Sequence, residues 1–364
     1  MVLTVSAVVL SRPLPAAAQA PADTSLKQEQ LGDGIYLFRA PSTLDVWTAT
    51  NVVVIVNDQD VTVFDSNTRP TTARMVIGEI RKLTNKPVRT LINSHWHMDH
   101  WSGNDEYVKA FPGIQIIATT QSRDYMKRMG APFFANEINP AVARERAALD
   151  SMIRTGKQGD GSKFTAEARR KREADVRHDE SAAKEISATP RVVPNVAFRD
   201  TLILWSGPRE FRLFSAMGDA TESAVLYLPR EKILVTGDVL VSPESGEGEP
   251  PWTTNSYAIT PWLASLRSFQ ALDASVIVPG QGPAMHDKTY LALTADLYAA
   301  VIAQVHAALE SGRATLESVQ ASVNVDSIGR LYPPHTGTLS PDFHQWVGSL
   351  TKKVLQESVD GALR

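Results

Sequence analysis

The segment from Asn93 to Asn104 reads NSHWHMDHWSGN and concentrates side chains that bind metals. Three histidines and one aspartate fall within six residues, in a chain of 364 residues with eight histidines. These residues are His95, His97, Asp99 and His100. Neutral imidazole and carboxylate bind divalent metals. In an extended segment His95 and His97 point the same way, whereas Asp99 and His100 fall on a turn that can face a second ion. An exposed polar loop is the alternative, but chance seldom places four such residues so closely.

The elements around this segment indicate an α/β fold. A strand over 88–93 leads directly into the histidines, and ligands in such folds bind at the carboxyl edge of the sheet. In the first half of the chain, alternation and helical spacing predict strands over 34–40, 51–57, 61–67 and 114–119 and helices over 71–85 and 105–110. In the second half they predict strands over 200–206, 210–216, 223–229, 232–238 and 275–283, a helix over 262–272, and mostly helix after 288. Alternating strands and helices favour layered α/β architecture.

Two segments differ in character from this core. Residues 132–190 are rich in Ala, Glu, Arg and Lys and poor in large apolar residues, which predicts a helical insertion lying over the domain. Residues 1–22 combine an apolar run with small residues near Ala20 and Ala22, which indicates a signal peptide and a periplasmic or secreted protein; a disordered Ala/Pro tail is the alternative. We find no other stretch with the ~18 apolar residues of a membrane span.

Composition excludes several classes of site. The 37 basic and 40 acidic residues give a net charge of −3, without the basic excess of a nucleic-acid-binding protein. The chain has no cysteine, so it has no disulfide, thiolate metal site or cysteine nucleophile. The expected partner is a small-molecule substrate, and the sequence does not indicate an oligomeric state.

The motif His95-Trp96-His97-Met98-Asp99-His100 resembles the HxHxDH signature of the metallo-β-lactamase-fold hydrolases. The resemblance continues in the turn at 65–67, in the paired strands of 224–240 that end near Asp238, and in the loop of 277–283. It implies an αββα sandwich with a metal site along one edge and Asp238 as the bridging ligand. The corresponding organisation is a domain over 23–293, interrupted by the insertion at 132–190, and a C-terminal helical extension over 294–364.

The chain departs from this family at two positions where the family has histidine ligands. Counting back from Pro229 places Asp219 at the first position, and Gln281 stands at the second. No histidine lies between His178 and His286, so a shifted alignment cannot restore either ligand. His286 itself is an alternative ligand, although a residue at that place more often lies at a helix start.

The substitutions change the predicted ligand sets. One ion would have His95, His97 and Asp219, and the second would have Asp99, His100, Asp238 and the weak oxygen ligand Gln281. Two histidines with one carboxylate hold zinc or non-haem iron, and certain alkylsulfatases of this fold also carry an acidic residue at the first position. One or two divalent ions are expected; zinc is favoured, and the oxygen-rich set makes manganese, iron or magnesium more competitive.

The resemblance implies metal-dependent hydrolysis. A metal-bound hydroxide, oriented by Asp99, would attack an ester, lactone, lactam, sulfate or phosphate centre. The loop of 242–262 follows Asp238, and its Trp252 and Tyr257 are candidate walls of a substrate pocket. Two alternatives stay open: a catalytically weak relative that binds a ligand or partner, and a mononuclear iron oxygenase on the same fold.

Overall fold

The structure is a computed structural model that describes residues 25–41, 50–133, 136, 138–220, 222–244, 258–313, 315–333 and 337–362. The predicted signal peptide at 1–22 and the predicted pocket residues Trp252 and Tyr257 lie outside the described residues.

The first sheet has seven strands, and they follow one another in chain order. Its strands are β1 (Lys27–Gly32), β2 (Ile35–Arg39), β3 (Asn51–Val56), β4 (Val61–Phe64), β5 (Val88–Ile92), β6 (Gln115–Thr119) and β7 (Val196–Phe198). The strands from β1 to β4 are antiparallel to their neighbours, whereas those from β4 to β7 are parallel. The parallel strands are connected by α1 (Pro70–Leu83), α2 (Asn104–Ala110), α3 (Thr120–Phe133) and the insertion.

The second sheet has five strands in the order β12, β11, β10, β9, β8. Their bounds are β8 (Thr201–Ser206), β9 (Arg209–Ala216), β10 (Ser223–Leu228), β11 (Ile233–Gly237) and β12 (Val276–Pro279). Only β11 and β12 are parallel, and the crossover between them contains α6 (Ile259–Ala271).

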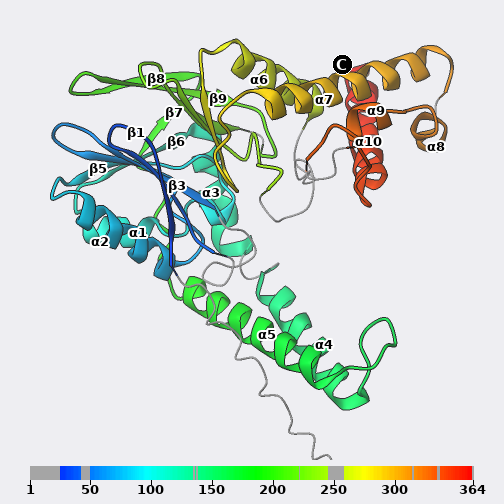
Figure 1. The fold of residues 1–364 in the computed structure, drawn as a ribbon, viewed down its shortest axis with the longest axis horizontal. Helices are drawn as coiled ribbons and strands as arrows, with labels where there is room; N and C mark the ends of the chain where they lie inside the picture. The colour runs from blue at the N-terminus through cyan, green and yellow to red at the C-terminus, as the bar shows by residue number, and fades with distance from the viewer. Residues whose placement is uncertain are drawn as a thin grey trace, which may run out of the picture.

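The two sheets pack face to face with helices outside, so the predicted αββα sandwich is confirmed (Figure 1). In β3, Val53 and Ile55 face the second sheet, whereas Val52 and Val54 face the helices α1 and α2. Strand β10 is likewise buried on both faces. Strands covered on both sides are expected to be continuously apolar, as residues 52–56 of β3 are.

Two edge strands of the first sheet were not predicted. Strand β1 has the sequence KQEQLG with largely exposed side chains, and β7 has three residues. Neither offers an apolar face long enough to indicate a strand. Their pairing partners β2 and β6 define them instead, through hydrogen bonds that sequence periodicity does not reveal.

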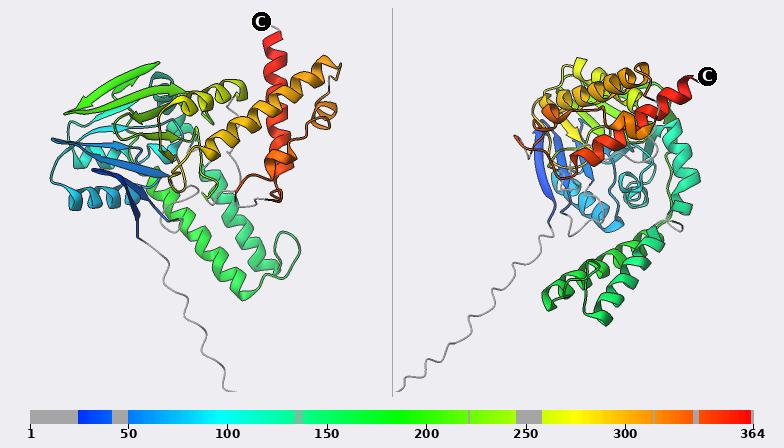
Figure 2. Two further views of the ribbon diagram at one scale, coloured as in Figure 1. Left: turned by 45° about the horizontal axis from the view of Figure 1, so that its top comes forward. Right: turned by 90° about the vertical axis from the view of Figure 1, so that its right-hand side faces the viewer.

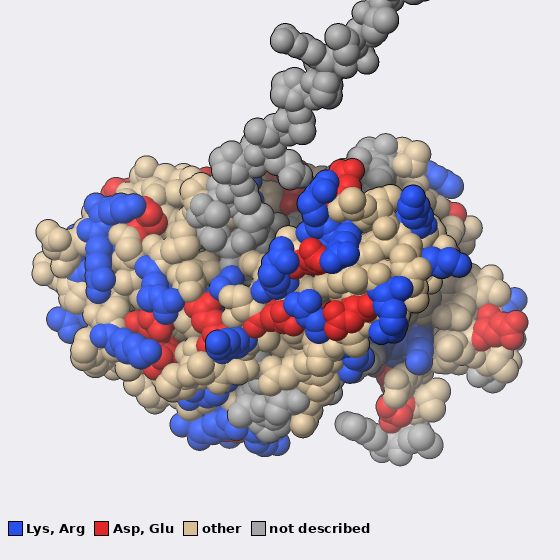
Figure 3. Space-filling model, turned by 90° about the horizontal axis from the view of Figure 1, so that it is seen from below, with Lys and Arg blue, Asp and Glu red and all other residues tan. Residues whose placement is uncertain are grey.

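The insertion contains the antiparallel helices α4 (Asn139–Thr155) and α5 (Ala166–Ser187). The prediction that it lies over the domain is wrong, because the pair projects away from the sheets (Figures 1 and 2). The helices bury Leu149 and Val176 and are joined by an ion pair between Arg146 and Glu180. On the face of the molecule that is seen from below, basic and acidic side chains are mixed (Figure 3). Because the helix pair buries its own apolar residues, it does not need to lie on a sheet.

The C-terminal part is helical, with α7 (Thr289–Glu310), α8 (Leu316–Gln320), α9 (Asp326–Gly329) and α10 (Phe343–Ala362). Helices α7 and α10 share one apolar core with α6. The predicted domain boundary at residue 294 lies within α7.

Helix α7 is the long apolar helix of the C-terminal part. Among the described residues it is the one helix long and apolar enough to cross a membrane by length and composition, a test that a buried core helix also passes. Half of its apolar window is buried, and it packs against α6 and α10. Burial in this core accounts for its apolar content.

Candidate metal centre

Two pairs of parallel strands deliver most side chains of the site, and Asp219 comes from the segment between the antiparallel strands β9 and β10. Strands β4 and β5 end level with each other, since Phe64 pairs with Ile92, and the segments that follow begin with Asp65 and Asn93. In the second sheet Gly237 pairs with Pro279, so Asp238 and Gln281 also leave adjacent strand ends. The carboxyl ends of parallel strands are where α/β folds bind ligands.

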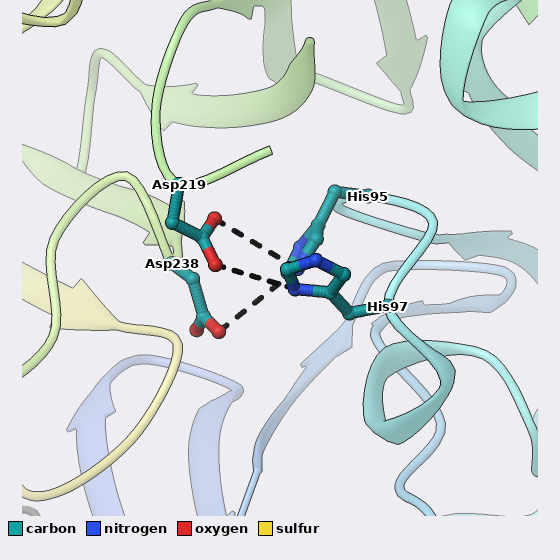
Figure 4. Close-up of side chains that lie close together, drawn as sticks. All are labelled: His95, His97, Asp219 and Asp238. Carbon is teal, nitrogen blue, oxygen red and sulfur yellow. Dashed lines mark ion pairs between the residues drawn. The ribbon is translucent and has the colours of Figure 1, made fainter. Parts of the chain in front are cut away.

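One cluster, the first ligand group, contains His95, His97, Asp219 and Asp238 (Figure 4). One ligand atom from each residue lies within 4.8 Å of the others. His97 Nδ1 is 3.2 Å from Asp219 Oδ2, and His95 Nε2 is 4.0 Å from Asp219 Oδ1 and 3.9 Å from Asp238 Oδ2. The structure therefore brings Asp219, in the segment between β9 and β10, to the position predicted for it beside the two histidines.

A second ligand group contains Asp99, His100 and Asp238, so Asp238 belongs to both groups. His100 Nε2 lies 3.0 Å from Asp99 Oδ2 and 3.2 Å from Asp238 Oδ2. Gln281 also reaches this group, and its amide Nε2 donates to Asp238 Oδ2 at 3.1 Å and, over 3.4 Å, to Asp99 Oδ2. The nitrogen, and not the carbonyl oxygen, therefore faces the carboxylates.

Buried hydrogen bonds from Asp65 and Ser94 orient the rings of His95 and His100. Asp65 accepts from the backbone N–H of Ser94 at 2.7 Å and from its hydroxyl at 2.8 Å, and His100 Nδ1 lies 2.7 Å from the same carboxylate. Ser94 Oγ is also 3.0 Å from His95 Nδ1. Because the single hydroxyl hydrogen goes to Asp65, the Ser94 oxygen accepts from Nδ1–H of His95. The lone pair of His95 is then on Nε2, which faces the first ligand group.

Thr50 contacts the second ligand group, although the sequence did not predict it. Its hydroxyl donates to Asp99 Oδ2 at 2.7 Å, and its backbone carbonyl accepts from Asn67 Nδ2 at 3.0 Å. Thr50 also forms an isolated β-bridge with Gln281. A threonine before a strand, 49 residues from its partner, gives no signal in a single sequence; only the pairing of distant segments identifies it.

Two glycines allow the close approach of the strand ends. Gly237 has φ of 52°, in the left-handed region that favours glycine, and a Cβ there would lie 2.6 Å from Ser94 Cβ. A Cβ on Gly280 would lie 1.8 Å from Asp238 Oδ1. Both positions are thus limited to glycine by the site itself.

Burial and neighbouring charges set the protonation of the site. Burial lowers the pKa of His95 well below its usual value, so its imidazole is neutral. Burial acts the same way on His97 and His100, but the neighbouring carboxylates outweigh it and raise the pKa of both, that of His100 strongly. Burial also raises the pKa of Asp238 to about 6. For Asp99 burial opposes ionisation, yet His100 holds its pKa well below the usual range.

The donor set fits a divalent cation. His95 Nε2 is buried and has no hydrogen-bond partner, although such atoms normally have one. A cation held by the two imidazoles and two carboxylates of the first ligand group would satisfy this atom. Nitrogen and oxygen ligands of this kind suit zinc and harder divalent ions such as manganese or iron.

The alternative ligand His286 lies outside both ligand groups. His286 is exposed and pairs with Glu29 at 3.4 Å, away from both ligand groups. Trp101 is buried, and its Nε1 donates to the backbone carbonyl of Trp96. Trp96 stacks on Tyr125 and meets His97 edge to face, so it borders the first ligand group.

Comparison with known proteins agrees with this architecture. Residues 45–281 match the family described as the metallo-beta-lactamase superfamily. The chain is 25% identical over 288 residues to a linear primary-alkylsulfatase of Pseudomonas sp. (strain ATCC 19151), which is 78% of this chain and 50% of that protein. The chain thus spans about half the length of this curated relative.

Solved structures share the fold at low identity. A metallo-beta-lactamase from Pontibacter korlensis is 14% identical with a TM-score of 0.52, over 76% of this chain and 99% of that one. The DIM-1 metallo-beta-lactamase is 16% identical with a TM-score of 0.50, over 75% and 97% of the two chains.

Proposed function

The chain belongs to the metallo-beta-lactamase superfamily, and on that premise we propose that it is a metal-dependent hydrolase of a small-molecule ester. The observation that carries this proposal is the first ligand group, in which four buried or largely buried side chains from three separate segments place ligand atoms within 4.8 Å of one another. Such convergence of imidazole and carboxylate is costly without a cation, since the carboxylates repel one another in a buried site.

The residues of the chain have distinct roles in this proposal. His95, His97, Asp219 and Asp238 would hold a divalent cation, which supplies Lewis acidity and makes a nearby water easier to deprotonate. Asp65 and Ser94 keep the rings of His95 and His100 in place. Asp99 remains a carboxylate because of His100, so it can accept a hydrogen bond from the attacking water and orient it.

A primary alkyl sulfate is the first substrate to test. The support is the relative named as a linear primary-alkylsulfatase, together with the carboxylate at position 219 beside the two histidines. Lactone, lactam, carboxylic ester and phosphodiester substrates form the comparison panel.

The experiment measures metal content and turnover in the same preparations. We expect the full chain, purified without chelator, to retain cation and to hydrolyse at least one substrate of the panel. His95→Ala with His97→Ala should lose both properties, because two nitrogen ligands are removed. The matched control is His286→Ala with His306→Ala, which removes two exposed imidazoles outside the ligand groups.

Equal metal in the wild type and in the His95/His97 variant would refute the metal site. Retained metal without turnover on any substrate would favour a ligand-binding protein over a hydrolase.

A further inference from the structure

Gln281 is turned the wrong way for a metal ligand. Its Nε2 donates to Asp238 Oδ2 at 3.1 Å and lies 3.4 Å from Asp99 Oδ2, while its Oε1 is buried without a hydrogen-bond partner. Gln281 is 4% exposed, so little of the residue is open to solvent. The amide therefore joins the two carboxylates that a second cation would have to join.

Thr50 and His100 aim at the same oxygens. Asp99 Oδ2 accepts the Thr50 hydroxyl at 2.7 Å and lies 3.0 Å from His100 Nε2, in addition to the Gln281 amide. An anionic oxygen that already has three donors around it has little remaining capacity to bind a cation. By contrast, His95 Nε2 in the first ligand group has no hydrogen-bond partner.

The backbone around Gln281 is also held in place. Asn51 Nδ2 donates to the carbonyls of Pro279 at 2.7 Å and Gly282 at 2.8 Å, and the backbone N–H of Ser242 donates to the carbonyl of Gln281 at 3.0 Å. The loop cannot withdraw the side chain without breaking these buried bonds. A local rotation of the amide is the remaining freedom of Gln281.

We propose that Gln281 and Thr50 are positioning residues that close the second ligand group by hydrogen bonding, so that the chain binds one cation, in the first ligand group. This inference rests on the proposed metal-dependent function. Rotating the amide would direct Oε1 at both carboxylates, and three oxygens would then repel one another unless a cation lay between them. Binding a second cation therefore requires that the amide rotate and that its two hydrogen bonds break.

The test counts cations per folded chain. Full-length protein is equilibrated with excess Zn²⁺, desalted and analysed by native mass spectrometry, with circular dichroism to confirm folding. We expect one Zn²⁺ in the wild type, because the amide donates to both carboxylates of the second ligand group instead of binding a cation. Gln281→His and the isosteric Gln281→Glu each add a ligand atom in place of the donor, and we expect two Zn²⁺ in whichever of them folds.

The outcomes separate this inference from the proposed function. Two Zn²⁺ in the wild type would overturn the inference and leave the metal-dependent function standing. One Zn²⁺ in both Gln281→His and Gln281→Glu would also overturn it, since the amide would not be what closes the second group. No Zn²⁺ in the wild type, as in His95→Ala with His97→Ala, would overturn the proposed function itself.

Discussion

The two sheets supply opposite halves of the site in different ways. The first sheet delivers His95, His97, Asp99 and His100 from one continuous turn after β5, whereas the second delivers Asp219, Asp238 and Gln281 from three separate segments. The first half contains all the imidazoles, and the second contains only oxygen ligands and an amide. A cation in the first ligand group thus depends on both sheets, and we expect the site to be only as rigid as the packing between them.

The largest effect should come from Asp238, which both ligand groups share. Asp238→Ala is expected to lower metal affinity by more than about 100-fold, beyond the 10–100-fold typical of residues that only orient ligands. A competition titration with a chelator measures this. The control is Asp273→Ala, which removes an exposed carboxylate that pairs with Lys232. If Asp238→Ala kept wild-type affinity, the histidine half alone would hold the cation.

A smaller effect is expected from Gly280, where the second half packs most tightly. Gly280→Ala places a Cβ against Asp238 and should lower the free energy of unfolding by about 1–3 kcal/mol, as overpacking does. Gly78→Ala is the matched control, since in helix α1 the added Cβ has nothing within 4 Å. Urea denaturation measures the free energy of unfolding of both variants. Equal values for Gly280→Ala and Gly78→Ala would mean that the loop at Gly280 accommodates the added Cβ without loss of stability.

The third prediction concerns the support behind the histidine half. Asp65→Asn removes the charge that faces Ser94 and His100 and should lower metal affinity by about 10–100-fold. Asp60→Asn is the control, because Asp60 precedes β4 and lies at the opposite end of this strand from Asp65. A chelator titration that gives the same affinity for both variants would assign Asp65 a role in folding alone.

The fourth prediction concerns the dependence of metal affinity on pH. In the metal-free protein the carboxylates raise the pKa of His97 and His100 despite burial, and burial raises that of Asp238 to about 6. These protons must leave when a cation binds, so acid stabilises the metal-free form. As the pH is lowered, we expect metal affinity to fall by about tenfold per pH unit for each proton displaced. The fall should begin above the ordinary imidazole pKa of about 6.5, because the pKa values of His97 and His100 are raised. Isothermal titration calorimetry in buffers of different ionisation enthalpy counts these protons. A metal affinity that does not change with pH would contradict this competition between protons and the cation.

The two halves of the site also differ in how well the sequence alone predicts them. The predicted motif of His95, His97, Asp99 and His100 came together as one unit because its residues are consecutive, and local geometry constrains neighbours strongly. Asp219 and Asp238 were placed by resemblance to a family, and the structure brings both beside the histidines. Trp252 and Tyr257 stay a prediction, since they lie outside the described residues.

Sequence alone determined the α/β class, most strands and the concentration of metal-binding side chains after Val88–Ile92, because periodicity and short motifs are local properties of the chain. Tertiary structure decided what depends on contacts between distant segments: the donation from Thr50 to Asp99, the inward amide nitrogen of Gln281, and the direction of the helix pair α4–α5. Hydrogen bonds across 49 or 182 residues are set by the packing of two sheets, and no periodicity along the chain encodes them.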